Sequence, residues 1–281
     1  MTDMIALAGV HYSYPDTETE VLRGIDLTVD AGQVVGVVGA SGVGKTTLAK
    51  VISGFIPHSE GGELSGGVEV DGIQVPTSTL ADVVSRVGLV TQNPFNQISG
   101  AKFTVREEIA FGLENLGVPR DEMIERVADV VELLGIEELV DRSPYALSGG
   151  QQQLVAIASM MVMAPRVLVM DEPTSQLDPS GSRLVFDIME SLASKGTAVI
   201  VFEHKLELLR ETAEVLHVLA DGVIAATGTP REVLSDARTD EWGVGATRFT
   251  RAARRAVEQG LLPKKTELPV SLPDAVEVFR R

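Results

Sequence analysis

The chain has 281 residues, 44% of them apolar, which is enough for a globular core with one or two lobes. It contains no cysteine, and this excludes a disulfide framework and a thiolate zinc site and favours a reducing compartment. The net charge of −16 argues against nucleic acid as an electrostatic partner.

The first ninety residues predict mainly β-structure. Apolar and polar residues alternate from Ile25 to Asp30, as expected of a strand with one buried face. Asp71 and Gly72 lie between two alternating runs and predict a hairpin. The intervening sequence QVVGVVG, residues 33–39, is continuously apolar and predicts a strand that is buried on both faces.

A glycine-rich P-loop, GASGVGKT, follows this strand and begins a predicted helix. Its glycines allow backbone N–H groups to turn inward at a helix N-terminus, where they bind phosphate. Lys45 is expected to reach the β- and γ-phosphates of a nucleotide, and the Thr46 hydroxyl to ligate Mg²⁺. By itself the motif predicts only an NTPase. The predicted nucleotide contacts here are Gly39, Ala40, Ser41, Gly42, Val43, Gly44, Lys45, Thr46 and Thr47.

Helical periodicity replaces the β-pattern from about residue 93 to residue 145. Thr104 and Glu107 have the spacing of a capping box, and Pro119 is expected to open a second helix as its first residue. The region therefore predicts a helical insertion in an α/β core. Its apolar faces are predicted to contain Val105, Ile109, Leu113 and Leu116 in the first helix, and Met123, Ile124, Val127, Val130, Val131 and Leu134 in the second.

The sequence LSGGQ, residues 147–151, comes next. Ser148 can cap a helix that runs from Gly150 towards Ala164 and leaves N–H groups facing outward as a second anion site. The predicted contacts at this site are Ser148, Gly149, Gly150 and Gln151.

The α/β core resumes after this helix. The apolar stretch from Leu154 to Met170 is interrupted by Pro165 and Arg166 and is shorter than the ~20 residues of a membrane-spanning helix, so it predicts a buried helix and then a buried strand. Asp171 and Glu172 end that strand. Asp171 is expected to hold Mg²⁺, and Glu172 to orient or deprotonate the attacking water.

Three further elements complete the predicted α/β core. Asp178 and Pro179 predict the N-cap and first residue of a helix, and the apolar run AVIVF, residues 198–202, predicts another buried strand. Asp221 and Gly222 predict a final hairpin. Because ligands bind at the carboxyl ends of parallel strands, the site is expected there.

The last 35 residues differ from the rest of the chain in charge. Residues 247–281 carry eight Lys and Arg against four Asp and Glu. Such a basic tail can meet anionic lipid or an acidic partner, and it can equally be a solvated helical tail.

Residues 4–234 together resemble an ABC ATPase domain, because the P-loop, LSGGQ and Asp171–Glu172 occur in that family's order and spacing. The resemblance implies ATP hydrolysis, with LSGGQ contacting the γ-phosphate of ATP on a partner subunit. It also implies that Gln92 senses Mg²⁺ and the lytic water, that His204 touches the γ-phosphate and that Tyr14 stacks on adenine. Residues 175–178 match the D-loop, which lies across the dimer seam.

Within the family, residues 92–119 resemble energy-coupling factor (ECF) transporter ATPases, in which Gln92-Asn-Pro94 is followed by a second glutamine, here Gln97. The helical tail after a lone ATPase domain is also similar to that subfamily. Two positions differ from the family pattern: Leu154 stands where arginine is usual, and Gln176 where a small residue is usual.

The resemblance implies a subunit that energises ECF-type uptake of a vitamin or metal ion, from the cytoplasmic face of the cell membrane. Its partners would be integral membrane subunits and a second ATPase chain, identical or related. The alternatives are the ATPase of a conventional ABC importer or exporter and a non-transport ABC protein. The expected architecture is a P-loop α/β domain over 1–234, with a mixed and parallel sheet core and a helical subdomain inserted at about 93–160. A helical extension over 235–281, with a capacity for dimerisation, would follow.

Overall fold

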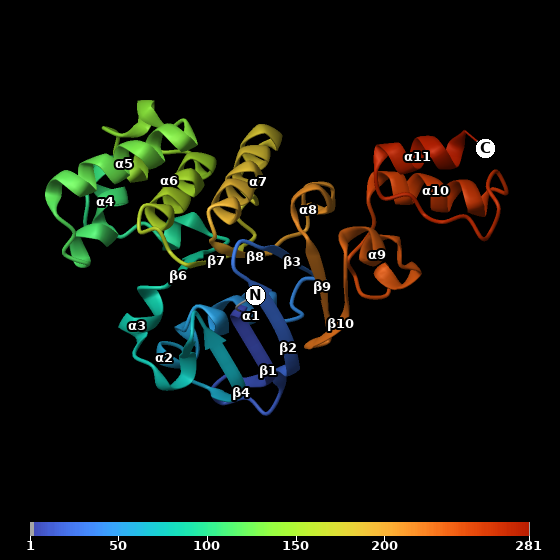
Figure 1. The fold of residues 1–281 in the computed structure, drawn as a ribbon, viewed down its shortest axis with the longest axis horizontal. Helices are drawn as coiled ribbons and strands as arrows, with labels where there is room; N and C mark the ends of the chain where they lie inside the picture. The colour runs from blue at the N-terminus through green and yellow to red at the C-terminus, as the bar shows by residue number, and fades with distance from the viewer. Residues whose placement is uncertain (1–2, 281) are drawn as a thin grey trace.

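Two β-sheets form the centre of the computed structural model, which describes residues 3–280 (Figure 1). The larger sheet has six strands in the order β10-β9-β3-β8-β7-β6. All of its pairings are parallel except that between β9 and β10, the hairpin predicted at Asp221–Gly222. Its strands are β3 (Val34–Val38), β6 (Val87–Val90), β7 (Val167–Asp171), β8 (Ala198–Phe202), β9 (Val215–Ala220) and β10 (Val223–Gly228).

The smaller sheet is antiparallel and has the order β2-β1-β4-β5. The hairpin predicted at Asp71–Gly72 joins β4 to β5. Helix α1 (Lys45–Ile52) packs against strands of both sheets, and Leu48 and Ile52 are fully buried there. The strands of this sheet are β1 (Asp3–Ser13), β2 (Glu20–Asp30), β4 (Glu63–Val70) and β5 (Ile73–Gln74).

Strands β3, β7 and β8 are buried at every position, as their apolar runs predict. In β7, Val167 and Val169 join the apolar cluster around α1, whereas Leu168 and Met170 join the cluster on the opposite face. Helices cover that opposite face, including α7 (Pro179–Ser194), whose predicted N-cap Asp178 accepts a hydrogen bond from the Gly181 N–H at 2.7 Å. A strand covered on both sides has no polar face, which explains the absence of alternation.

The helical subdomain consists mainly of α4 (Val105–Asn115), α5 (Arg120–Leu134) and α6 (Gly149–Met161). The predicted capping box of Thr104 and Glu107 is confirmed at the start of α4. Two positions assigned to the apolar faces are wrong: Leu116 is 54% exposed because it follows the last turn of α4, and Ile124 is 55% exposed because it lies at the edge of the buried stripe of α5.

Three predicted helix boundaries differ from the structure. Helix α6 begins at Gly149, one residue before the predicted Gly150. Pro119 is the N-cap of α5 and not its first residue. Helix α6 ends at Met161, three residues before the predicted Ala164, which has a φ of 50° and precedes Pro165. A residue before proline is disfavoured in the helical conformation, so the helix stops earlier. The other short helices are α2 (Phe55–His58), α3 (Leu80–Val84), α8 (Leu206–Thr212) and α9 (Pro230–Ser235), with 3-10 turns at Val75–Thr77, Pro94–Asn96, Glu137–Leu139, Pro144–Ala146 and Ala237–Thr239.

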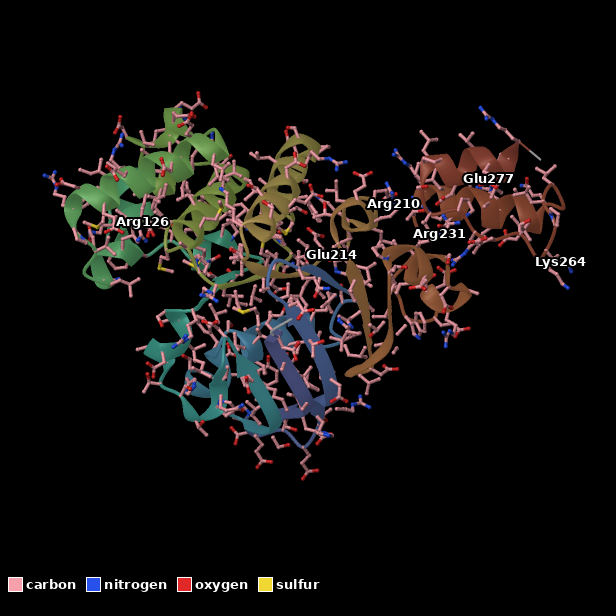
Figure 2. All side chains as sticks on the ribbon, in the orientation of Figure 1. Arg126, Arg210, Glu214, Arg231, Lys264 and Glu277 are labelled. Atoms are coloured by element: carbon pink, nitrogen blue, oxygen red, sulfur yellow. The ribbon has the colours of Figure 1, made fainter. Side chains whose placement is uncertain are left out.

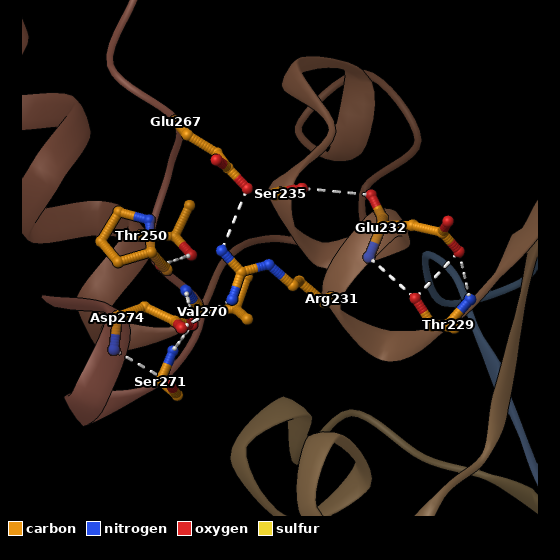
Figure 3. Close-up of polar contacts among 10 residues, drawn as sticks. Thr229, Arg231, Glu232, Ser235, Thr250, Glu267, Val270, Ser271 and Asp274 are labelled. Carbon is orange, nitrogen blue, oxygen red and sulfur yellow. Dashed lines mark hydrogen bonds and ion pairs between the residues drawn. The ribbon is translucent and has the colours of Figure 1, made fainter. Parts of the chain in front are cut away.

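The C-terminal extension contains α10 (Arg248–Glu258) and α11 (Leu272–Phe279) and lies at the opposite end of the molecule from the helical subdomain (Figure 1). Arg231 of α9 contacts it through ion pairs to Asp274 at 2.7 Å and Glu267 at 3.0 Å (Figure 3). Figure 2 shows Arg231 beside this extension. The boundary predicted at residue 234 falls within α9, and the division into two domains there stays a prediction.

None of the helices within residues 3–280 combines the length and the apolar character that a membrane crossing needs.

Candidate nucleotide site

The P-loop connects the carboxyl end of β3 to the first turn of α1. Gly39 has a φ of 159°, and a Cβ at this position would lie 2.1 Å from the Leu219 carbonyl oxygen, so no larger residue fits. The Lys45 ammonium donates to the carbonyls of Gly39 at 3.0 Å and Ala40 at 2.7 Å. Burial lowers the pKa of Lys45, and the carboxylates of Glu172 and Asp171 oppose this shift. Lys45 therefore lies at the junction of the P-loop and α1, close to the carboxylates of Asp171 and Glu172.

Asp171 ends β7 as a buried carboxylate beside the P-loop. Burial raises the pKa of its carboxyl group, while a hydrogen bond with the Thr46 side chain lowers it. Its Oδ1 atom has no hydrogen-bond partner within residues 3–280. Asp171 and Thr46 line a cavity of about 230 Å³ together with Gln92. A buried carboxylate oxygen without a partner, next to hydroxyl and amide oxygens, fits a hard cation such as Mg²⁺.

Glu172 brings Gln92 and His204 together. The Gln92 side-chain amide donates to Glu172 Oε2 at 2.7 Å, and His204 Nε2 lies 3.1 Å from Glu172 Oε1. These three residues follow β6, β7 and β8, which are neighbours in the parallel sheet. The three predicted catalytic side chains therefore converge at the carboxyl edge of the sheet, with one carboxylate between an amide and an imidazole.

Tyr14 lies near the P-loop helix, with its hydroxyl 3.0 Å from Thr47 Oγ1 and its ring packed edge-on against Tyr12. The Thr47 side chain is buried, whereas Thr46 is exposed. Thr47 therefore contacts the predicted adenine platform as well as belonging to the predicted phosphate loop. Stacking of Tyr14 on adenine stays a prediction.

Ser148 is the N-cap of α6 and forms a capping box with Gln151. Its hydrogen bonds are with the first turn of its own helix. The glycines at this turn lie against Gln176, because a Cβ at Gly150 would be 3.0 Å from the Gln176 carbonyl oxygen and one at Gly149 would be 3.1 Å from its side-chain oxygen. The unusual Gln176 thus packs against the LSGGQ turn of the same chain.

Sequence reasoning missed a polar cluster directly behind His204. Glu203 is buried and accepts a hydrogen bond from the buried Thr174, and Lys205 donates to the Thr174 carbonyl at 3.0 Å. The sequence contained one signal for this cluster, because the charged residue Glu203 directly follows the apolar run 198–202. Within residues 3–280, no cluster of three or more His, Cys, Asp or Glu side chains could hold a metal ion, so a cation at this site would depend on Asp171 with hydroxyl and amide oxygens.

The chain is similar to characterised families along most of its length. A family model described as ABC transporter matches residues 22–175. A putative ABC transporter ATP-binding protein of Pyrococcus abyssi is 40% identical over 235 residues, covering 83% of each chain. The energy-coupling factor transporter ATP-binding protein EcfA of Methanothermobacter thermautotrophicus is 40% identical over 234 residues, covering 83% of this chain and 73% of that protein.

A solved structure has the same fold. It is CbiO1 from Clostridium perfringens, described as part of the ABC transporter complex CbiONQ; its TM-score is 0.75 at 27% identity, and the match covers 93% of this chain and 100% of that one. The predicted fold and family are confirmed. The chain belongs to the ABC transporter family, and it is an ATP-binding ATPase subunit that energises an ABC transporter.

Proposed function

We propose that this subunit energises ECF-type uptake of a vitamin or metal ion, with Glu172 positioning the water that attacks the γ-phosphate of ATP. The convergence of Gln92 and His204 on Glu172 carries the catalytic part of this proposal. A carboxylate fixed at both oxygens can accept a proton from water, while the neighbouring amide and imidazole orient the nucleophile and the phosphoryl oxygens. Lys45 and the P-loop residues 39–47 hold the triphosphate.

Mg²⁺ belongs to this proposal through the side chains of Thr46, Gln92 and Asp171. The buried Oδ1 of Asp171, which has no hydrogen-bond partner in residues 3–280, supports the assignment. When bound, the cation would neutralise charge on the β- and γ-phosphates. Burial raises the pKa of Asp171, and the hydrogen bond with Thr46 opposes this shift. Gln92, whose side-chain amide donates to Glu172, would be a further ligand of the cation.

The complete site requires a second chain in this proposal. Ser148 and the N-terminus of α6 form a phosphate-binding helix start whose hydrogen bonds involve its own turn. Two chains arranged head to tail would place this turn of one subunit over the P-loop of the other and enclose two ATP molecules. Closure would supply positioning and exclude water, and product release would reopen the dimer. The second chain is a copy of this one or a related ATPase.

Three exposed aromatic residues of the helical subdomain support the assignment of a membrane partner. Phe103 is 86% exposed, and the exposed rings of Phe95 and Tyr145 pack edge to face with their centroids 6.0 Å apart. Exposed aromatic groups of this kind mark interaction surfaces. Phe95 lies three residues after Gln92, so a partner bound here would contact the segment that leads to the catalytic site. We place integral membrane subunits at this surface, on the cytoplasmic face of the membrane.

The ECF relatives favour this function over that of a conventional ABC importer or exporter. Purification of the tagged chain from membranes identifies the integral partner. A partner related to conventional permeases would reject the ECF assignment and leave the ATPase chemistry unchanged. Recovery of the chain without any membrane protein would reject the docking role proposed for these exposed aromatic residues.

The test of the catalytic assignment is Glu172→Gln in the full-length chain. Loss of the catalytic base should lower kcat by ~10²-fold or more while nucleotide binding is retained. Glu190→Gln, on the exposed surface of α7, is the matched control and should hydrolyse ATP normally. Steady-state hydrolysis and equilibrium binding of labelled ATP provide the two readouts. Near-normal turnover of Glu172→Gln would reject its role as the base.

A further inference from the structure

Glu203 is a buried carboxylate in the turn that carries His204. The residue is 3% exposed. Oε2 accepts hydrogen bonds from the backbone N–H groups of His204 at 2.6 Å and Lys205 at 3.2 Å, and Oε1 accepts one from the hydroxyl of Thr174. A buried carboxylate is stable only when such donors compensate for its lost hydration. These bonds therefore hold the backbone of the turn that carries His204 in one conformation.

Lys205 contacts the same threonine from the other side of His204. Its ammonium donates to the Thr174 carbonyl at 3.0 Å and to the Ser182 hydroxyl at 2.6 Å. The two residues that flank His204 thus hold Thr174 at its hydroxyl and at its carbonyl. Thr174 is fully buried and lies two positions after Glu172.

We propose that Glu203, Thr174 and Lys205 form a clamp that positions His204 against Glu172. The clamp joins the turn after β8 to the segment 174–182, which leads into α7. Movement of that segment would therefore move His204 with it. This inference rests on the proposed function, in which His204 and Glu172 act at the γ-phosphate.

The exposure of His204 explains why a clamp is needed. Its side chain is 39% exposed, and its Nε2 atom lies 3.1 Å from Glu172. A side chain with so much access to solvent is not fixed by packing, so its direction depends on the backbone that carries it. Glu203 and Lys205 fix that backbone from both sides. Neither is assigned a phosphate contact, so both are positioning residues.

The first test is Glu203→Gln, which places an amide donor among groups that already donate. The proposal predicts kcat about tenfold lower and a KM for ATP within about twofold of the wild-type value, since binding remains intact. Glu108→Gln is the matched control, because Glu108 is 4% exposed and likewise accepts from a backbone N–H and a hydroxyl, those of Ser99 at 2.7 and 2.8 Å. Its kcat should be unchanged.

A double variant separates positioning from general destabilisation. If Glu203 acts through His204, adding Glu203→Gln to His204→Ala should cause no further loss of rate in single-turnover hydrolysis, which keeps slow rates measurable. Thr174→Val, which removes only the hydroxyl, should reproduce the kcat defect of Glu203→Gln. A further tenfold loss in the double variant would overturn the clamp, as would a normal kcat in either Glu203→Gln or Thr174→Val.

The outcomes also distinguish the clamp from the proposed function. Normal kcat in both His204→Ala and Glu172→Gln would overturn the catalytic assignment and the clamp with it. Inactive His204→Ala and Glu172→Gln beside a fully active Glu203→Gln would overturn the clamp alone. KM and the thermal midpoint are measured for both Glu203→Gln and Glu108→Gln. If the two variants change equally in these quantities and both keep a normal kcat, Glu203 has only a structural role.

Discussion

Glu172 shows how a single backbone conformation builds the site. Its φ of 46° lies in the left-handed region, which costs about 1–3 kcal/mol for a residue other than glycine. The surrounding backbone holds it there: its N–H donates to the Phe202 carbonyl at 2.9 Å, and its carbonyl accepts from the Ser175 N–H at 3.1 Å. This strained turn directs the carboxylate to Gln92 and His204. The strain is therefore located at the proposed catalytic base.

A second residue, His217 in β9, predicts a pH dependence of stability. Burial lowers its pKa from 6.5 to about 4, and its Nδ1 is paired with the Thr227 hydroxyl at 2.8 Å. Because the unfolded chain takes up this proton near pH 6.5 and the folded chain only near pH 4, stability is lost as pH falls through that window. The gap corresponds to about 3 kcal/mol at most.

His217→Asn, which keeps a polar group near Thr227, should remove this contribution. Urea denaturation at pH 7, 6 and 5 should show a smaller loss of unfolding free energy in the variant than in the wild type. Parallel pH profiles for the two proteins would mean that His217 titrates normally in the folded state.

At the scale of elements, helix ends and strand faces follow local sequence closely. The start of α4 illustrates this, because Thr104 accepts from the Glu107 N–H while the Glu107 carboxylate accepts from the Thr104 N–H. The N–H of Phe103 and the Thr104 side chain hold the pKa of Glu107 below its usual value. The sequence pattern predicted this capping box because both partners lie within four consecutive residues.

Thr104→Ala should lower the free energy of unfolding by about 1 kcal/mol, since one N–H at the start of α4 loses its acceptor. Thr104→Ser keeps the hydroxyl and is the matched control. Chemical denaturation of both variants measures the difference. Equal stability of the alanine and serine variants would show that the cap contributes nothing to this helix.

At the scale of the whole molecule, the arrangement of Ser148 and the P-loop makes a prediction about assembly. A variant damaged at the signature turn (Ser148→Arg) and another damaged at the catalytic acid (Glu172→Gln) should each form nearly inactive homodimers. In a mixed dimer, one site combines an intact P-loop and Glu172 with the partner's intact Ser148. Hydrolysis should return to roughly half the wild-type rate per heterodimer, and to less if closure is cooperative.

Differential tags verify that the measured species is the heterodimer, and wild type carrying the same tags is the control. If both groups served a nucleotide from the same chain, every subunit in the mixture would carry a fatal lesion. A verified heterodimer without restored activity would therefore contradict the head-to-tail arrangement. If the chain pairs only with a related ATPase, the same two lesions are distributed over that pair.

The family and the candidate phosphate-binding motifs could be identified from sequence because each motif is local. The P-loop, the LSGGQ turn and the acid pair Asp171–Glu172 are each runs of consecutive residues next to a strand or a helix start. The continuous apolar runs of β3, β7 and β8 likewise predicted strands covered on both faces. Gln92, His204 and Tyr14 were identified only through resemblance to the ABC family, since a single residue at a strand end has no pattern of its own.

Contacts between distant segments were decided by tertiary structure. The order β8-β7-β6 brings Gln92 and His204, which are 112 positions apart, to one carboxylate. Packing between segments also buries Glu203 beside Thr174, whereas Ile124 and Leu116 stay exposed at the edge and the end of their helices. By itself, the sequence determined the family, the candidate phosphate-binding residues and which strands are buried. Only the fold decided which of them meet, because strand order and side-chain burial depend on packing between segments that the local pattern does not encode.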